Sequence, residues 1–216
     1  MNTEILLDHE PVADGGHVVR ALLRITGEAP ESDQRRPLNL GVVLDRSGSM
    51  TGPKLARARE AASLLVRRLA DDDVVSLVTY DDEVQTLAAR AAGARRQELA
   101  ARIDAIHTGG TTNLSGGWLR GRELVAEGGA PRGEGELGSE AAISRVLLLT
   151  DGLANVGITD PGTLKDLVAS AAATGVSTST IGFGQDYDER LLRGMAEAGG
   201  GSTYYIETPD QAPAVF

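Results

Sequence analysis

The sequence predicts an α/β fold in which a doubly wound, mostly parallel central sheet carries helices on both faces. Two observations lead to this prediction. Short apolar runs of strand length alternate with longer amphipathic segments through most of the chain, an order typical of parallel strands joined by helical crossovers. The apolar runs LNLGVVL at 38–44 and VVSLVTY at 74–80 also lack a clear polar alternation, which indicates strands buried on both faces.

The helices are predicted from apolar residues at helical spacing and from their end signals. They are expected at 54–70, 95–106, 114–126, 161–174 and 187–198. Further strands are expected at 144–150, 176–183 and 202–206, and a short strand at 84–88 should return antiparallel to the strand at 74–80. The glycine-rich, acidic stretch 128–139 is predicted to be a surface loop.

The N-terminal part is predicted to add one strand to this domain. Residues 17–26 alternate polar and apolar side chains, which favours a half-exposed edge strand. We therefore expect residues 1–36 to form this strand and a connection packed on the domain, and residues 37–210 to form the domain itself. The apolar ending Ala214-Val215-Phe216 hints that residues 211–216 are a truncated tail.

The composition excludes several classes of protein. A chain of 216 residues suits one medium domain, and 41% apolar with 24% charged residues is an ordinary globular balance. The absence of cysteine excludes disulfide frameworks, thiolate zinc sites and cysteine nucleophiles. A formal net charge of −10 without a basic patch argues against nucleic acid as a partner.

The ends and the apolar runs of the chain indicate its compartment. The N-terminus lacks the basic start and apolar run of a secretion signal, and no apolar stretch reaches membrane-spanning length. A chain without cysteine also suits a reducing environment. We therefore expect a soluble, cytoplasmic protein without membrane insertion.

Two aspartates directly follow two strands of the predicted sheet. Asp45 ends the strand 38–44, and Asp151 ends the strand 144–150. Ligand groups collect at the carboxyl ends of parallel strands, so two negative charges should meet at one edge of the sheet, which is unfavourable without compensation. No lysine or arginine is placed beside both, and the side chain of Arg46 should point away from that of Asp45. A bound cation is the simpler explanation.

Hydroxyl side chains supply further oxygen donors near this edge. Ser47 and Ser49 alternate with Asp45, so all three can turn to one side of a partly extended chain. Thr111 and Thr112 lie where one predicted helix ends and the next begins. Oxygen donors without histidine or cysteine favour a hard ion, namely Mg²⁺, Mn²⁺ or Ca²⁺.

These segments resemble the metal-ion-dependent adhesion site (MIDAS) of von Willebrand factor type A (VWA) domains. Asp45-Arg46-Ser47-Gly48-Ser49 resembles the family's D-x-S-x-S element, and Thr150-Asp151-Gly152 resembles its strand-terminal T-D-G. The third element of the family is a threonine followed five residues later by glycine and then by an apolar residue. Thr112, with Gly117 and Trp118, fits this spacing, and Thr111 is the alternate.

The resemblance implies a Rossmann-like VWA domain of bacterial type. The hydroxyls of Ser47, Ser49 and Thr112 would contact the ion, and Asp45 and Asp151 would bind it directly or through water. Because Mg²⁺ takes six oxygen ligands, one position would stay open for an external carboxylate. The implied function is a metal-dependent protein–protein interaction module that binds an Asp or Glu residue of another protein.

Two other functions remain open at this point. A metal-dependent hydrolase would need a general base, and only His107, before the threonine loop, is suitably placed. The chain has neither a phosphate-binding G-x-x-x-x-G-K-[ST] loop nor a G-x-S-x-G elbow, so we expect no enzymatic activity. The second alternative is a metal-independent scaffold subunit. Trp118 is expected to pack against the sheet rather than to line a partner surface.

Overall fold

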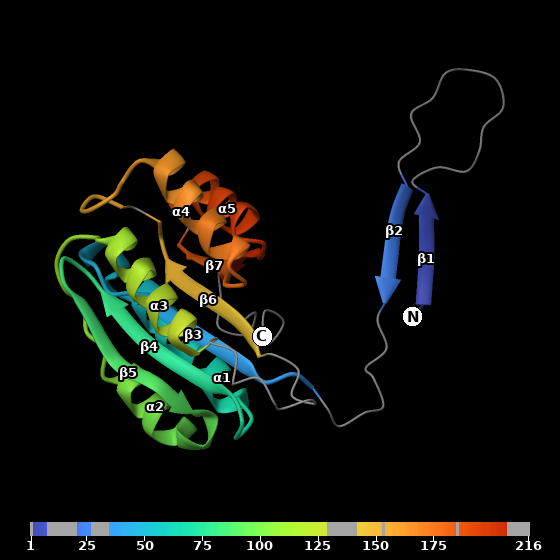
Figure 1. The fold of residues 1–216 in the computed structure, drawn as a ribbon. Coiled ribbons are helices and arrows are strands. Elements are labelled where there is room, and N and C mark those ends of the chain that lie inside the picture. Colours follow the sequence, from blue (N-terminus) through green and yellow to red (C-terminus); the bar gives the residue numbers. More distant parts are fainter. Residues whose placement is uncertain are drawn as a thin grey trace. The chain divides into compact units, whose positions relative to one another are not determined.

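The computed structural model describes residues 2–7, 21–26, 35–128, 142–152, 154–184 and 186–206 (Figure 1). The chain divides into two compact units, residues 1–35 and residues 36–216. The predicted loop from residue 129 onward and the predicted tail 211–216 lie outside the described residues.

The larger unit is built around a six-stranded sheet with the order β5-β4-β3-β6-β7-β8. All neighbouring strands pair parallel except β4 and β5, which pair antiparallel. This confirms the mostly parallel sheet with one antiparallel strand. The strands are β3 (Leu38–Asp45), β4 (Val74–Tyr80), β5 (Val84–Ala92), β6 (Ile143–Thr150), β7 (Ser177–Phe183) and β8 (Thr203–Ile206).

Strand β5 continues beyond the predicted end at residue 88. Two irregularities in its register with β4 let the pairing persist as far as Val74 opposite Ala92. The second half of β5 is rich in alanine, so it lacks the alternation of polar and apolar residues that marks a strand. The predicted strand therefore ended before the observed one.

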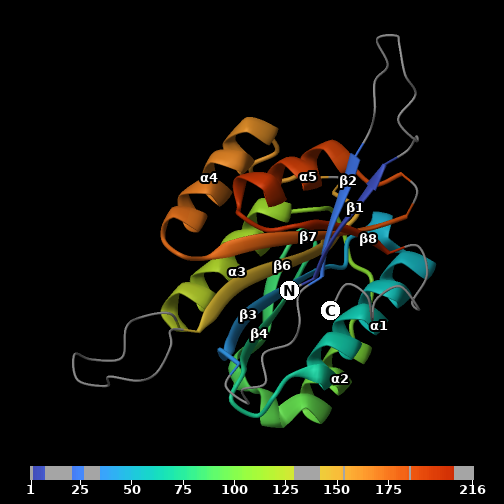
Figure 2. The same cartoon turned by 90° about the vertical axis from the view of Figure 1, so that its right-hand side faces the viewer.

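Helices cover both faces of the sheet, as the two perpendicular views show (Figures 1 and 2). One core lies between the sheet and the pair α1 and α2, and a second core lies between the sheet and the helices α3, α4 and α5. The sheet is therefore doubly wound, and every helix forms within two residues of its predicted limits. The helices are α1 (Pro53–Arg68), α2 (Arg96–Asp104), α3 (Leu114–Gly128), α4 (Pro161–Ala173) and α5 (Glu189–Ala198), with short 3₁₀ turns at Gly48–Met50 and Gly93–Arg95.

Glycines let α3 lie close to the sheet. A Cβ atom on Gly117 would come within 2.3 Å of the Tyr80 ring, and one on Gly121 would come within 2.3 Å of a methyl group of Val43. Glycine weakens a helix by roughly 1 kcal/mol relative to alanine. In α3 this cost is offset by close packing of the helix on the sheet, at a distance that no larger residue would permit.

Trp118 lies on the same buried face of α3. Its side chain is 1% exposed, and its indole Nε1 donates a hydrogen bond to the Thr178 hydroxyl of β7 at 3.1 Å. The expectation that this tryptophan packs against the sheet is confirmed, and its only polar atom has a buried partner, as burial of an indole requires.

The smaller unit contains a two-stranded antiparallel sheet. Strand β1 (Asn2–Leu7) pairs with β2 (Ala21–Thr26), with Asn2 opposite Thr26 and Leu7 opposite Ala21. The sequence predicted one half-exposed edge strand over residues 17–26. The structure has the strand β2 at Ala21–Thr26, and it pairs with β1 in a two-stranded sheet. Strand β1 escaped notice because its apolar residues are consecutive rather than alternating. The packing of residues 1–36 on the domain stays a prediction.

Within the described ranges, no helix combines the length and the apolar character that crossing a membrane would require.

Replacing Gly121 by alanine should lower the free energy of unfolding by about 1–3 kcal/mol, because the new methyl group overpacks against Val43. Denaturant unfolding followed by circular dichroism measures this. The matched control is Gly162→Ala in the first turn of α4, where the nearest atom to a Cβ is the Asp160 carboxylate at 3.2 Å. The control should be neutral or slightly stabilising. Equal effects of the two substitutions would contradict a close approach of α3 to the sheet.

Candidate metal site

The two predicted aspartates leave the sheet at the same edge. Strands β3 and β6 are parallel neighbours, with Leu44 opposite Leu149, so Asp45, the last residue of β3, and Asp151, directly after β6, lie at the carboxyl ends of adjacent strands. Both residues are 0% exposed. Burial raises the pKa of Asp45 above its ordinary value, hydrogen bonds from Ser47 and Thr150 oppose this, and the negative charge of Asp151 adds to the increase. The two carboxylates are therefore electrostatically coupled, as expected.

Three donors hold the Asp45 carboxylate in a fixed orientation. Its Oδ1 accepts a hydrogen bond from the Ser47 backbone N–H at 2.8 Å. Its Oδ2 accepts hydrogen bonds from the hydroxyls of Thr150 at 2.6 Å and Tyr80 at 3.2 Å. Burial, reinforced by the charge of Asp45, raises the pKa of Tyr80 well above its usual range, so the phenol stays a donor. No role for Tyr80 was predicted from the sequence.

The turn after β3 brings the two serine hydroxyls together. Ser47 Oγ and Ser49 Oγ lie 3.1 Å apart, and the 3₁₀ turn Gly48–Met50 produces this approach. Ser47 is buried, whereas Ser49 is exposed. The two serine hydroxyls therefore lead from the buried Asp45 carboxylate to the solvent-exposed surface.

Backbone hydrogen bonds join this turn to the threonine loop. The Gly48 N–H donates to the Gly110 carbonyl at 2.8 Å, and the Gly109 N–H donates to the Arg46 carbonyl at 2.7 Å. A Cβ atom on Gly109 would lie 1.6 Å from an Asp81 oxygen, so this position has no room for a side chain. Two segments more than sixty residues apart are thus held edge to edge.

Asp81, directly after β4, anchors the junction. Its Oδ1 accepts hydrogen bonds from the Glu83 N–H at 3.0 Å and from Arg46 at 3.1 Å, and its Oδ2 accepts one from the Gly110 N–H at 3.2 Å. Partial burial acts to raise the pKa of Asp81, but the two amides and the Arg46 guanidinium outweigh it and hold the pKa below its ordinary value. Arg46 is thus directed to Asp81 rather than to Asp45.

Thr112 is fixed to the loop that follows Asp151. Its backbone N–H donates to Asn155 Oδ1 at 2.8 Å, and its carbonyl accepts the N–H groups of Asn155 and Val156, both at 3.1 Å. Thr112 is 2% exposed, whereas the alternate Thr111 is exposed. Burial therefore favours Thr112 as the inward-facing threonine. Asn155 was not recognised from the sequence, because no spacing rule connects it to the threonine loop.

A lysine contacts one of the two aspartates. Lys54, in the first turn of α1, places its Nζ 3.1 Å from Asp151 Oδ2 and 2.8 Å from Asp186 Oδ1. Partial burial opposes the charged form, but the two carboxylates outweigh it and raise the pKa of Lys54. From the sequence, no lysine or arginine was expected beside both aspartates. Lys54 compensates Asp151, and it was missed because its distance from Asp151 along the chain gave no sign of the contact.

The donor types at this edge fit a hard cation. Among the described residues, no group of three or more His, Cys, Asp and Glu side chains is arranged so that it could hold a metal ion. An ion here would therefore need hydroxyl ligands in addition to carboxylates, and such all-oxygen sets suit Mg²⁺, Mn²⁺ or Ca²⁺. The residues that would contribute are Asp45, Ser47, Ser49, Thr112 and Asp151.

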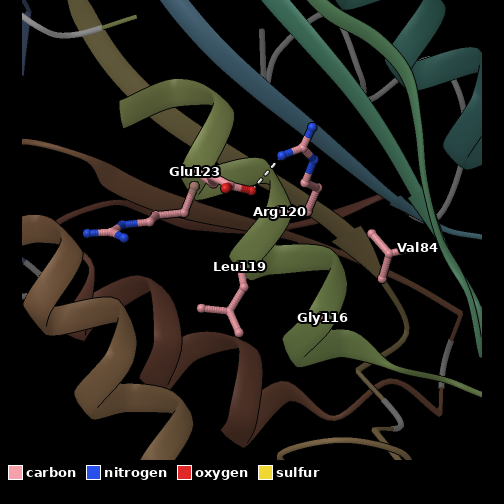
Figure 3. A pocket seen from close by; sticks show the side chains of 6 residues that line it. Val84, Gly116, Leu119, Arg120 and Glu123 are labelled. Atoms are coloured by element: carbon pink, nitrogen blue, oxygen red, sulfur yellow. Dashed lines mark hydrogen bonds and ion pairs between the residues drawn. The ribbon is translucent and has the colours of Figure 1, made fainter. Parts of the chain in front are cut away.

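A surface hollow of about 500 Å³ opens beside α3 (Figure 3). It begins at the site edge of the sheet, because Val84 pairs opposite Tyr80 and Gly116 belongs to the first turn of α3. Val84 and Leu119 expose 37% and 38% of their surface. The residues that line it are Val84, Gly116, Leu119, Arg120, Arg122 and Glu123, with Arg120 paired to Glu123.

The chain belongs to the von Willebrand factor type A domain family. The family model matches residues 39–216. Among curated proteins, the chain is 31% identical over 201 residues to the uncharacterised protein YfbK of Escherichia coli strain K12, an alignment that covers 91% of this chain and 33% of YfbK. The chain likewise spans less than half the length of several other curated relatives that it matches.

Two solved structures share the fold. One is proximal thread matrix protein 1 of the mussel byssus with a zinc-occupied MIDAS motif, at a TM-score of 0.64 and 17% identity, covering 83% of this chain and 46% of that one. The other is the manganese-loaded TRAP protein of Plasmodium vivax, at a TM-score of 0.64 and 17% identity, covering 83% of this chain and 72% of that one. At this identity the likeness establishes the fold alone.

Removing the Asp81 side chain should destabilise the domain by about 1–3 kcal/mol, because it leaves the partly buried guanidinium of Arg46 and the N–H groups of Glu83 and Gly110 without their acceptor. Thermal or urea unfolding of Asp81→Ala measures this. Asp82→Ala, at the exposed neighbouring position, is the control and should change stability by less than about 0.5 kcal/mol.

The difference between Asp81→Ala and the wild type should also depend on pH. The pKa of Asp81 is lower in the folded chain than in the unfolded chain, so its contribution is present above the unfolded pKa of about 3.9 and is lost as the pH falls through the folded value. The two proteins should therefore converge in stability in strong acid. A gap that widened as the pH fell would contradict this assignment.

Proposed function

We propose that this domain binds a divalent cation at Asp45, Ser47, Ser49, Thr112 and Asp151 and, through the cation, a carboxylate of a partner protein. The observation that carries the proposal is the arrangement at one sheet edge. Two fully buried carboxylates end adjacent parallel strands beside two serine hydroxyls 3.1 Å apart. Family membership and the metal-loaded neighbours support an interaction module of this kind.

The charges at the site suit an anionic partner group. Two carboxylates would balance the charge of a divalent ion, and hydroxyl ligands add no charge. The bound ion would keep one coordination position open, and as a Lewis acid it would accept one further oxygen there. Thr150 and Tyr80 occupy one oxygen of Asp45 and thereby limit its donation to the ion. Ser49 is exposed, so the site opens to solvent on the serine side. An Asp or Glu of a partner would approach from there.

The hollow on α3 extends the proposed contact surface. Val84 and Leu119 offer exposed apolar surface at the same end of the sheet, and Arg120 and Arg122 place positive charge around it. A partner segment with an acidic residue and apolar neighbours would be complementary to this combination.

The ion and the compartment are proposed from the oxygen donors and the composition. We propose Mg²⁺ as the ion, with Mn²⁺ or Ca²⁺ as alternatives of the same ligand preference. The cytoplasmic location stays a prediction, based on a sequence without cysteine.

The domain is proposed to act without catalysis. The hydrolase alternative would rely on His107, whose side chain is exposed and makes no hydrogen bond to the candidate ligands within the described residues. Turnover of generic phosphate or ester substrates with Mg²⁺, lost on His107→Ala, would support that alternative instead.

Titration calorimetry with Mg²⁺ and Mn²⁺ tests the site directly. The wild-type chain should bind one ion, and Asp45→Asn or Ser49→Ala should weaken binding by about tenfold to a hundredfold or more, because each removes or neutralises a ligand. Asp166→Asn, on the exposed side of α4, is the charge-matched control and should bind as the wild type does. Absence of binding heat, or equal heat with Asp45→Asn, would favour the metal-independent scaffold.

Partner capture should require the ion. Immobilised wild-type chain incubated with extract in Mg²⁺ should retain a protein that a chelator releases, and Ser49→Ala, which alters an exposed residue and spares the core, should not retain it. Millimolar acetate should compete with the retained protein, because it offers the same carboxylate chemistry. Capture that proceeds equally in chelator would contradict a metal-mediated contact.

A further inference from the structure

One ammonium group is shared between a buried and an exposed carboxylate. Lys54 Nζ lies 3.1 Å from Asp151 Oδ2 and 2.8 Å from Asp186 Oδ1. The side chain of Asp151 is 0% exposed, that of Lys54 is 17% exposed, and that of Asp186 is 69% exposed. The lysine thus stands between an inner carboxylate at the candidate metal site and an outer carboxylate at the surface.

The structure leaves a passage for this side chain. A Cβ atom on Gly184, which follows β7, would lie 2.3 Å from Lys54 Cε. Gly184 has φ +87°, a conformation that other residues rarely adopt. Glycine at this position therefore makes room for the lysine stem between α1 and the loop that carries Asp186.

The position of the ammonium conflicts with a metal ion on Asp151. A buried carboxylate is unfavourable without a positive partner, and Lys54 supplies one. A divalent cation that takes Asp151 as a ligand would meet the ammonium as a like charge at short range in a partly buried place, where repulsion is strong. The two cations therefore compete for the same carboxylate.

We propose that Lys54 is a built-in substitute cation, which neutralises Asp151 while no ion is bound and moves fully to Asp186 when an ion takes Asp151. This inference rests on the proposed metal site and adds to it a residue that sets the affinity for the ion. Asp186 serves as the alternative acceptor that lets the ammonium withdraw without losing its pairing.

The two partners of this device should act in opposite directions. Lys54→Met removes the competitor and should tighten Mg²⁺ and Mn²⁺ binding by about tenfold. Asp186→Asn removes the alternative acceptor, keeps the ammonium on Asp151, and should weaken binding by roughly threefold to tenfold. Lys165→Met, on α4, changes the net charge in the same way as Lys54→Met and should leave affinity unchanged.

A double-mutant cycle separates this mechanism from a general field effect. If Asp186 acts through Lys54, Asp186→Asn should have no effect on ion affinity in the Lys54→Met background, whereas a long-range charge effect would persist there. Calorimetry on the four proteins of the cycle gives the answer. An unchanged or weakened affinity in Lys54→Met, or an additive cycle, would overturn the proposal.

Stability measurements supply a second readout. In chelator, Lys54→Met should melt below the wild type, because Asp151 loses its ion pair with Lys54, and saturating Mg²⁺ should narrow or reverse the difference in melting temperature. Lys54→Arg serves as the second variant should Lys54→Met fail to fold. It keeps the positive charge, so its affinity for the ion should stay as weak as that of the wild type. A wild-type chain that binds no ion would refute the proposed function itself, whereas ion binding that is indifferent to Lys54 would refute only this inference.

Discussion

Two buried negative charges at the ends of adjacent parallel strands impose the constraint on which the rest of this domain depends. Parallel pairing of β3 with β6 leaves Asp45 and Asp151 at one edge, and helices on both faces exclude the water that would otherwise solvate them. Much of the polar structure nearby satisfies these charges. Hydroxyls surround Asp45, and an ammonium reaches Asp151 from α1. The proposed metal site would compensate these charges as well, and it would leave one coordination position of the ion for a partner.

Close approach of main chains places the other candidate ligands. Gly117 and Gly121 let α3 pack closely against the sheet, and the threonine loop directly precedes this helix. Gly109 and Gly110 then allow that loop to bond to the turn containing the serines, with Asp81 tying the junction from β4. Glycines that look unfavourable when the segments are considered alone are explained by these tertiary contacts.

Much of the fold could be predicted from the sequence, because periodicity and apolar runs report burial directly. Helix limits and the parallel strands followed from this signal, as did the positions of Asp45 and Asp151 at strand ends. The roles of Lys54, Tyr80 and Asn155 could not be predicted in the same way, because each depends on which loops become neighbours after the chain is wound. Strand β1 was missed for a related reason, since only its pairing with β2 identifies it as a strand.

The hydrogen bond between the Thr112 loop and the Asn155 loop has a consequence for the stability of the folded domain. The proposed ligands come from three segments, and the pairing of β6 with β3 and the hydrogen bond from the Thr112 N–H to Asn155 Oδ1 connect these segments in the folded chain. A cation bound at the proposed site would need all three segments in place, so it would bind the folded chain more tightly than partly folded forms. Its concentration would then add directly to the persistence of the native state. The supply of divalent ions would thus affect the stability of the folded domain as well as its binding of a partner.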